Sequence, residues 1–292
     1  MPELLDTNYI LDRIEVQPPY FALRDLKLDH NGEIISAIVP VEQSSKMECS
    51  SITAAESGRH LAILGSCLLS VVNPEQGKFY YLANSAVYEA NLLTENMDTS
   101  CLIGYASANF LKKREAAAKA QLRTADQKLL CDLDLRYHVI PERIFQRLFS
   151  KHRQPLMKCP VGFSPYKNIP DFTSLQISKD KKVLNATFTE LLPENCLGHF
   201  PMYPAVPIAI LSHYLISASG HLLQKITNDA KLKYQVKKVN LSAPNLCFVS
   251  ERLSLQISFL IKENNIYTFQ GIAYADTNKC VGEMTINLMV LN

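Results

Sequence analysis

The sequence predicts an α+β protein in which one order of elements, a strand, a long helix and then several strands, occurs twice. Two mostly apolar stretches of about 20 residues, 51–73 and 206–226, are rich in Ala, Ser and Gly and have the character of buried helices. Alternating, β-branched or aromatic segments separated by turn signals follow each of them. Another extended stretch precedes each one, at 33–43 and 182–192. The two halves share this order but little residue identity, which indicates a weak internal repeat.

Four extended segments are predicted after each helix. Their ranges are 78–90, 101–113, 114–127 and 128–140 in the first half, and 234–243, 252–263, 266–276 and 280–292 in the second. The segment 114–127 is rich in Ala, Glu and Lys, which favour helix. It also alternates small apolar and polar residues, and its counterpart in the second half is plainly a strand. We therefore predict a strand there.

The domain organisation follows from the same pattern. A chain of 292 residues is long enough for two units of ordinary size. The segment 151–172 is polar and rich in proline, as linkers are, and a short helix is predicted just before it, over 141–152. We predict an N-terminal unit over 1–150, a linker over 151–172 and a C-terminal unit over 173–292.

Composition excludes several classes of function. The net charge is +2, so no overall field favours nucleic acid or membranes, and no run of apolar residues is long enough to span a membrane. The eight cysteines form no C-x-x-C pair and have irregular spacing. This pattern predicts free thiols in a reducing compartment, and therefore a cytoplasmic protein without a metal site. The basic clusters at 179–182 and 231–238 are interpreted as solvated charge; a binding patch there would suit an acidic partner such as a carrier protein.

One short segment carries most of the chemical information. It reads G-H-F-P-M-Y-P-A-V-P over 198–207, immediately before the second long helix. Three prolines restrict the backbone around His199, whose imidazole suits proton transfer near neutral pH. The helix that begins near Pro207 offers free N–H groups and a positive dipole end, which would polarise a thioester carbonyl. The segment therefore indicates a base held beside an electrophilic helix end; a histidine that only satisfies a turn is the alternative.

This segment resembles the signature of the β-hydroxyacyl-thioester dehydratases of fatty-acid synthesis, G-H-F-P-x-x-P-x-x-P-G. The resemblance extends over 175–292, whereas over 1–150 it rests on element order alone. It implies the hotdog fold, a long helix wrapped by a curved antiparallel sheet, and two such halves imply a double hotdog. Two positions depart from the pattern: Ile208 replaces the family glycine, and His213 replaces the family acid.

The resemblance also implies a reaction. A β-hydroxyacyl chain on a carrier protein or coenzyme A would lose water to give the trans-2-enoyl thioester, with no cofactor. In the family the base and the acid come from opposite hotdogs, so the acid for His199 should lie on the first-half helix. Glu56 is the one carboxylate in that helix, and burial would raise its pKa as a general acid requires. Alternatively, Glu56 is an exposed residue at a helix start, and aligning Gly65 with Gly220 puts Gly58 in the acid position.

The remaining site predictions concern the walls of the pocket. The residues expected to contact substrate are Gly198, Phe200, Pro207, Ile208, Arg59, His60 and His213. Arg59 could bind a phosphate or carboxylate, although an ion pair with Glu56 is the favoured role. His213 should face the other half's site, which we expect to be degenerate because the matching turn at 39–51 contains no histidine.

Two other functions remain open at this stage. Other hotdog proteins hydrolyse thioesters with a carboxylate and a held water molecule, and this chain could do the same. A non-catalytic acyl-binding subunit is the third possibility, because the side chain of Ile208 could narrow or block the tunnel. The chain has no nucleotide-binding or nucleophilic-serine motif. Sheet edges left unpaired by this fold would allow homo-oligomers to form.

Overall fold

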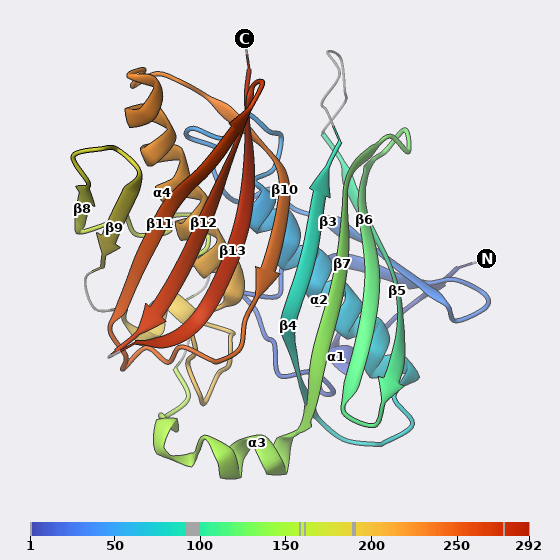
Figure 1. The fold of residues 1–292 in the computed structure, drawn as a ribbon. Coiled ribbons are helices and arrows are strands. Elements are labelled where there is room, and N and C mark those ends of the chain that lie inside the picture. Colours follow the sequence, from blue (N-terminus) through green and yellow to red (C-terminus); the bar gives the residue numbers. More distant parts are fainter. Residues whose placement is uncertain are drawn as a thin grey trace.

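The computed structural model describes residues 2–91, 100–157, 159–160, 162–188, 191–276 and 278–291. Within these residues, 13 strands form one sheet, accompanied by four α-helices (Figure 1). The helices are α1 (Thr7–Leu11), α2 (Ala54–Val72), α3 (Glu142–Leu148) and α4 (Ile208–Thr227). The strands are β1 (Glu3–Leu4), β2 (Arg24–Leu28), β3 (Ile34–Val39), β4 (Phe79–Ala90), β5 (Leu102–Lys112), β6 (Glu115–Thr124), β7 (Leu129–Pro141), β8 (Ser174–Ile177), β9 (Val183–Thr187), β10 (Tyr234–Ser242), β11 (Leu253–Glu263), β12 (Ile266–Ala275) and β13 (Lys279–Val290).

The spatial order of strands in the sheet is the same in the two halves, which follow the repeated order of elements predicted along the chain. The first half runs β3-β5-β6-β7-β4, and the second half runs β9-β11-β12-β13-β10 when read from its outer edge. The two halves meet where β4 pairs antiparallel with β10, from Glu89 opposite Lys238 to Ser85 opposite Ser242. Figure 1 shows the resulting arrangement, in which β4 and β10 stand side by side at the centre. Both halves therefore contribute to the middle of one sheet.

Each long helix packs against the strands of its own half. Helix α2 contacts β3 to β7, helix α4 contacts β9 and β11 to β13, and the two helices contact each other. The Thr53 hydroxyl caps α2 by accepting a hydrogen bond from the N–H of Glu56 at 3.2 Å. Helix α4 begins directly after Pro207 and ends at Asn228 in the left-handed conformation. Most residues of both helices are buried, as their nearly uniform apolar character predicts.

A glycine in each long helix lets a tyrosine from the sheet approach closely. The Tyr137 hydroxyl lies against Gly65 and donates to the carbonyl oxygen of Ala62 at 2.8 Å. The Tyr234 ring lies against Gly220 in the same way, and its hydroxyl donates to a carbonyl oxygen of α4 at 3.4 Å. The two tyrosines come from β7 and β10, which do not occupy equivalent positions in the two halves, so the alignment of Gly65 with Gly220 stays a prediction.

The Ala-rich segment is a strand, as predicted. Strand β6 pairs with β5 on one side and β7 on the other. Its buried residues alternate along the strand, namely Ala116, Ala118, Ala120 and Leu122. Pairing on both edges and burial of one face outweigh the helix propensity of Ala, Glu and Lys, which is worth less than about 1 kcal/mol per residue.

The N-terminal segment before β3 contains elements that were not predicted from the sequence. Strands β1 and β2 extend the sheet beyond β3, and β8 extends the opposite edge beyond β9. Between α1 and β2 the chain crosses to the second half, where the N–H of Gln17 donates to the carbonyl oxygen of Gly198 at 2.9 Å. This contact places the N-terminal segment beside the turn at 198–207, which contains His199.

The linker region agrees in outline with the sequence. Helix α3 and a short 3₁₀ turn at Ser150–His152 occupy the range predicted as a short helix. The described residues from 153 to 173 contain neither helix nor strand. The division into units at 150 and 173 stays a prediction, because one sheet runs through both halves. All eight cysteines are free thiols, and none of the described helices has the length and hydropathy of a membrane span.

Candidate functional site

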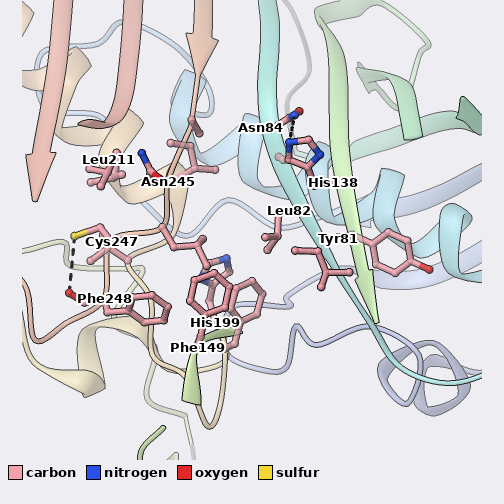
Figure 2. A pocket seen from close by; sticks show the side chains of 18 of the residues that line it. Tyr81, Leu82, Asn84, His138, Phe149, His199, Leu211, Asn245, Cys247 and Phe248 are labelled. Carbon is pink, nitrogen blue, oxygen red and sulfur yellow. Dashed lines mark hydrogen bonds between the residues drawn. The ribbon is translucent and has the colours of Figure 1, made fainter. Parts of the chain in front are cut away.

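A cavity of about 570 Å³ lies between the two halves, close to the turn that precedes α4. The first half contributes side chains from α2, β4 and β7, and the second half contributes the start of α4 and the loop after β10. Figure 2 shows His199 between these walls, with Leu82 of β4 on one side and Phe248 of the loop on the other. The cavity is thus shared by both halves, as the resemblance implies.

His199 is held in one orientation and in its neutral form. Its Nδ1 donates to the carbonyl oxygen of Ala205 at 3.0 Å, which leaves the Nε2 lone pair unprotonated in the neutral ring. The Tyr20 ring meets the imidazole edge-on with 4.8 Å between ring centroids, and Phe200 stacks on it at 4.1 Å. Burial lowers the pKa of His199 to about 4, so the imidazole is uncharged at neutral pH and can accept a proton.

Gly198 shapes the turn but does not line the cavity. Its φ of +84° lies in the region that favours glycine, and a Cβ there would overlap the carbonyl oxygen of Gln17. The backbone of the N-terminal segment therefore covers one side of Gly198, and its predicted contact with substrate stays a prediction. Its role is to let the segment that carries Tyr20 lie against the His199 turn.

The other residues of the turn lie around the N-terminal end of α4. Phe200 is buried, lines the cavity and packs edge-on against Tyr80. Pro207 precedes the helix, and its carbonyl oxygen accepts from the N–H of Ile210 at 2.9 Å. Ile208 is the first helical residue and lines the cavity, which stays open beside its side chain. Pro207 itself is not among the lining residues, so its effect is on the backbone.

Glu56 does not share this cavity with His199. Its Oε1 accepts from the N–H of Glu42 at 2.5 Å, and its Oε2 accepts from the N–H of Gln43 at 3.2 Å. These bonds hold the carboxyl against the turn before α2, where burial raises its pKa. The structure therefore does not bring the predicted base and acid together. Under the alternative alignment of Gly65 with Gly220, Gly58 and not Glu56 would stand at the family acid position.

One carboxyl group is found among the described residues that line the His199 cavity. It belongs to Glu251, whose Oε2 accepts from the N–H of Phe248 at 2.7 Å and whose other oxygen is paired with Lys279. Both oxygens therefore already have partners. The His199 cavity thus contains a neutral base and a carboxylate that is held in an ion pair.

Arg59 and His60 follow Glu56 on α2, and Nε2 of His60 lies 3.9 Å from Oε1 of Glu56. The Nη2 of Arg59 is paired with the Glu42 carboxylate and lies 3.0 Å from Nε2 of His60. Burial and the nearby guanidinium lower the pKa of His60 well below its usual value. Ligand atoms of Glu42, Glu56 and His60 lie within 4.8 Å of one another, but the Arg59 guanidinium already supplies the positive charge in that cluster. His60 lines none of the described cavities, contrary to prediction.

His213 lines a separate cavity of about 710 Å³, which is formed by α4, the turn before α2 and the segment at 167–175. Burial lowers the pKa of His213 to about 4. Glu48 lies in the same cavity, where it accepts from the N–H of Ala54 at 2.8 Å and burial raises its pKa to about 7. The sequence analysis overlooked Glu48, although its position just before a helix start is typical of a capping carboxylate.

Other residues of the His199 cavity were also missed. Tyr20 belongs to a segment without periodic pattern, so no sequence signal placed it beside His199. Asn84 and His138 lie on paired strands and are joined by a hydrogen bond of 2.9 Å between Asn84 Nδ2 and His138 Nε2 (Figure 2). His152 stacks on Phe248 with 3.8 Å between ring centroids. Their positions depend on strand pairing and on the path of the linker, which sequence spacing does not reveal.

No protein-family model and no curated protein matches the sequence. Among solved structures, a protein from Lactobacillus plantarum assigned as an oleoyl thioesterase has a TM-score of 0.59 at 12% identity, covering 90% of this chain and 98% of that one. The 12:0-ACP thioesterase from Umbellularia californica has a TM-score of 0.57 at 9% identity, with coverage of 94% and 100%. A protein of unknown function with a hotdog fold from Alicyclobacillus acidocaldarius has a TM-score of 0.50 at 6% identity, with coverage of 93% and 96%.

These similarities extend over nearly the full length of both chains in each comparison. At such low identities they show a common fold and not a common reaction. The chain therefore has a hotdog fold.

Proposed function

We propose that this protein hydrolyses acyl thioesters of coenzyme A or of an acyl carrier protein, with His199 as the general base. We further propose that each half is one hotdog unit, so that the site lies between two units of a double hotdog. The observation that carries the proposal is the neutral imidazole of His199, which lines the shared cavity and whose Nδ1 is bound to the Ala205 carbonyl, so that Nε2 can accept a proton.

Hydrolysis needs one base and a polarised carbonyl, and both are available. Nε2 of His199 would accept a proton from a water molecule, whose oxygen would attack the thioester carbon. The tetrahedral intermediate would then collapse as the C–S bond breaks, and the imidazolium would return its proton to the thiolate. The products are a carboxylic acid and a free thiol, and no cofactor takes part.

The start of α4 supports the second requirement. The first N–H groups of a helix have no partner within the helix and lie at its positive dipole end. Ile208 begins α4 and lines the cavity, and Ala209 follows it. Their N–H groups would donate to the carbonyl oxygen as negative charge develops on it, a contribution that other enzymes obtain from an oxyanion hole.

The solved structures support the choice of substrate class. Two of the similar proteins are described as thioesterases, one for an oleoyl chain and one for a 12:0 chain on a carrier protein. The lining of the cavity suits an acyl chain because it includes Ile63, Leu82, Val206 and Leu211. The volume of about 570 Å³ is in the range of small-molecule sites.

Dehydration is the second candidate, and the G-H-F-P-x-x-P-x-x-P motif favours it. That reaction needs an acid to protonate the departing hydroxyl in addition to the base. Glu56 is held at another turn, and Glu251 is paired with Lys279. The described lining of the cavity thus supports hydrolysis better than elimination.

A thiol-release assay on a series of acyl-CoA substrates tests the proposal. We expect His199→Gln to lower kcat/KM by at least about a hundredfold, the usual contribution of a general base. His30→Gln is the matched control, because His30 is exposed on the turn between β2 and β3 and should leave turnover unchanged. Full turnover by His199→Gln would refute the role of His199. Binding of acyl-CoA by the wild-type protein without thiol release would favour the non-catalytic subunit.

A further inference from the structure

A narrow slot adjoins the His199 cavity and lies between the two long helices. It measures about 60 Å³ and shares Tyr20, Ala62, Ala83 and Ile208 with the cavity. Small residues form much of its wall; these include Ala54, Ala55, Gly58, Ala86 and Ala209. A water molecule needs about 10–15 Å³ by this measure, so the slot has room for the end of a slender chain. An acyl group bound in the cavity can therefore extend into it.

Arg59 is the one strongly polar group in the described wall of this slot, and it is only 2% exposed. Its Nη2 is paired with Glu42. The Tyr20 and Tyr166 rings cover the guanidinium, with its central carbon 5.6 Å and 5.1 Å from their centroids. The Nε and Nη1 atoms have no hydrogen-bond partner among the described residues. Two buried N–H donors without an acceptor are costly, and a ligand oxygen would satisfy them.

The charges around Arg59 indicate what kind of oxygen this would be. Glu42 already balances the guanidinium, and the Glu56 carboxyl lies close enough to act on Arg59 electrostatically. His60 is neutral because burial and Arg59 lower its pKa. A second carboxylate would therefore add uncompensated negative charge to a buried site, whereas a neutral oxygen would accept hydrogen bonds without that cost.

We propose that the substrate carries a neutral oxygen acceptor, a ketone or a hydroxyl, near the distal end of its acyl chain, and that Arg59 Nε and Nη1 donate to it. This inference rests on the proposed thioester hydrolysis and narrows its substrate class. The Tyr20 ring contacts both Arg59 and His199. The reacting carbon and the distal oxygen are therefore separated by a short chain, for which a six-carbon acyl group is a suitable probe.

Competing six-carbon substrates test the inference directly. The probes are hexanoyl-CoA, its analogue with a ketone on the penultimate carbon, its analogue with a terminal hydroxyl, and adipyl-CoA, which ends in a carboxylate. We expect kcat/KM for the ketone or the hydroxyl analogue to exceed that for hexanoyl-CoA by about tenfold or more, as a charge-assisted hydrogen bond allows. Equal or faster turnover of hexanoyl-CoA would overturn the inference. A preference for adipyl-CoA alone would overturn the neutral character of the oxygen.

A double variant assigns the preference to Arg59. Arg59→Met combined with Glu42→Gln removes both members of the ion pair, so neither partner is left behind as an unpaired charge. The preference for the oxygenated analogue should then fall to about twofold or less. A preserved preference in a folded variant would overturn the assignment. If the wild-type protein hydrolyses none of the probes, the proposed hydrolysis fails, but the ratio of Kd values from calorimetry still decides whether Arg59 recognises the oxygen.

Discussion

At the scale of single residues, the protonation state of His199 decides which chemistry is available. Burial keeps the ring neutral, and the Ala205 carbonyl fixes which nitrogen carries the proton. The sequence could predict this residue because the surrounding prolines and glycine stand at fixed spacings. It could not predict the surroundings of Glu56, because the carboxyl is captured by backbone N–H groups of a turn that has no regular pattern.

The pH dependence of turnover follows from the lowered pKa of His199. A base with a pKa of about 4 is about nine-tenths deprotonated at pH 5 and more so above it, so kcat/KM should change little between pH 5 and pH 8. Activity should be lost only as the pH falls through about 4, where the imidazole becomes protonated. The measurement is initial thiol release at saturating and limiting substrate across this range. A limb with an apparent pKa near 6.5 would show that the imidazole is exposed to water during catalysis.

The raised pKa of Glu48 predicts that the free energy of unfolding falls as the pH rises. Its pKa is about 7 in the folded protein against about 4.5 in the unfolded chain. The unfolded chain therefore releases its proton first as the pH rises, and the penalty on folding grows from about pH 4.5 to about pH 7 and stays at its full size above that. Glu48→Gln removes this penalty. The variant should gain about 3 kcal/mol in unfolding free energy relative to wild type between pH 4.5 and pH 8, measured by urea titration. A constant difference across this range would contradict the raised pKa of Glu48.

At the scale of elements, the contact between each long helix and the sheet depends on a glycine. The sequence indicated both helices and the alternation of β6, because the positions that face the core are occupied by apolar or small residues at regular intervals. It did not indicate which residues approach the helices, because that depends on strand register. Tyr137 of β7 lies far from Gly65 along the chain, whereas Tyr234 begins β10, the strand that directly follows α4.

Alanine substitutions in the long helices should therefore have opposite effects at different glycines. A Cβ at Gly65 would lie 2.6 Å from the Tyr137 hydroxyl, and one at Gly220 would overlap the Tyr234 ring. We expect Gly65→Ala and Gly220→Ala each to destabilise the protein by about 1–3 kcal/mol. Gly58→Ala is the matched control, because nothing lies within 4 Å of its Cβ position, and it should stabilise α2 by about 0.5–1 kcal/mol. Thermal or urea unfolding measures all three, and equal effects at the three sites would refute the close packing.

At the scale of the whole molecule, the two halves are joined at more places than the linker. Strands β4 and β10 pair, α2 and α4 contact each other, and the N–H of Gln17 bonds to Gly198 across the halves. The repeated order of elements predicted two similar units. The N-terminal crossing could not be predicted, because its residues have neither helical nor strand periodicity.

This joining predicts that the chain unfolds as one cooperative unit. Separation of the halves would expose the paired edges of β4 and β10 and the buried faces where α2 contacts α4. Calorimetry should therefore show a single transition, with a calorimetric enthalpy close to the van't Hoff enthalpy. Two resolved transitions would show that the halves are energetically independent domains.

Product analysis in heavy-oxygen water tests the central claim most directly. The wild-type protein is incubated with acyl-CoA and 3-hydroxyacyl-CoA substrates, and the products are identified by mass spectrometry. Hydrolysis with His199 as base predicts free thiol and a carboxylic acid that carries one heavy oxygen, from both substrates, with loss of both products in His199→Gln. An enoyl thioester formed from the 3-hydroxyacyl substrate, without any labelled acid, would contradict the account.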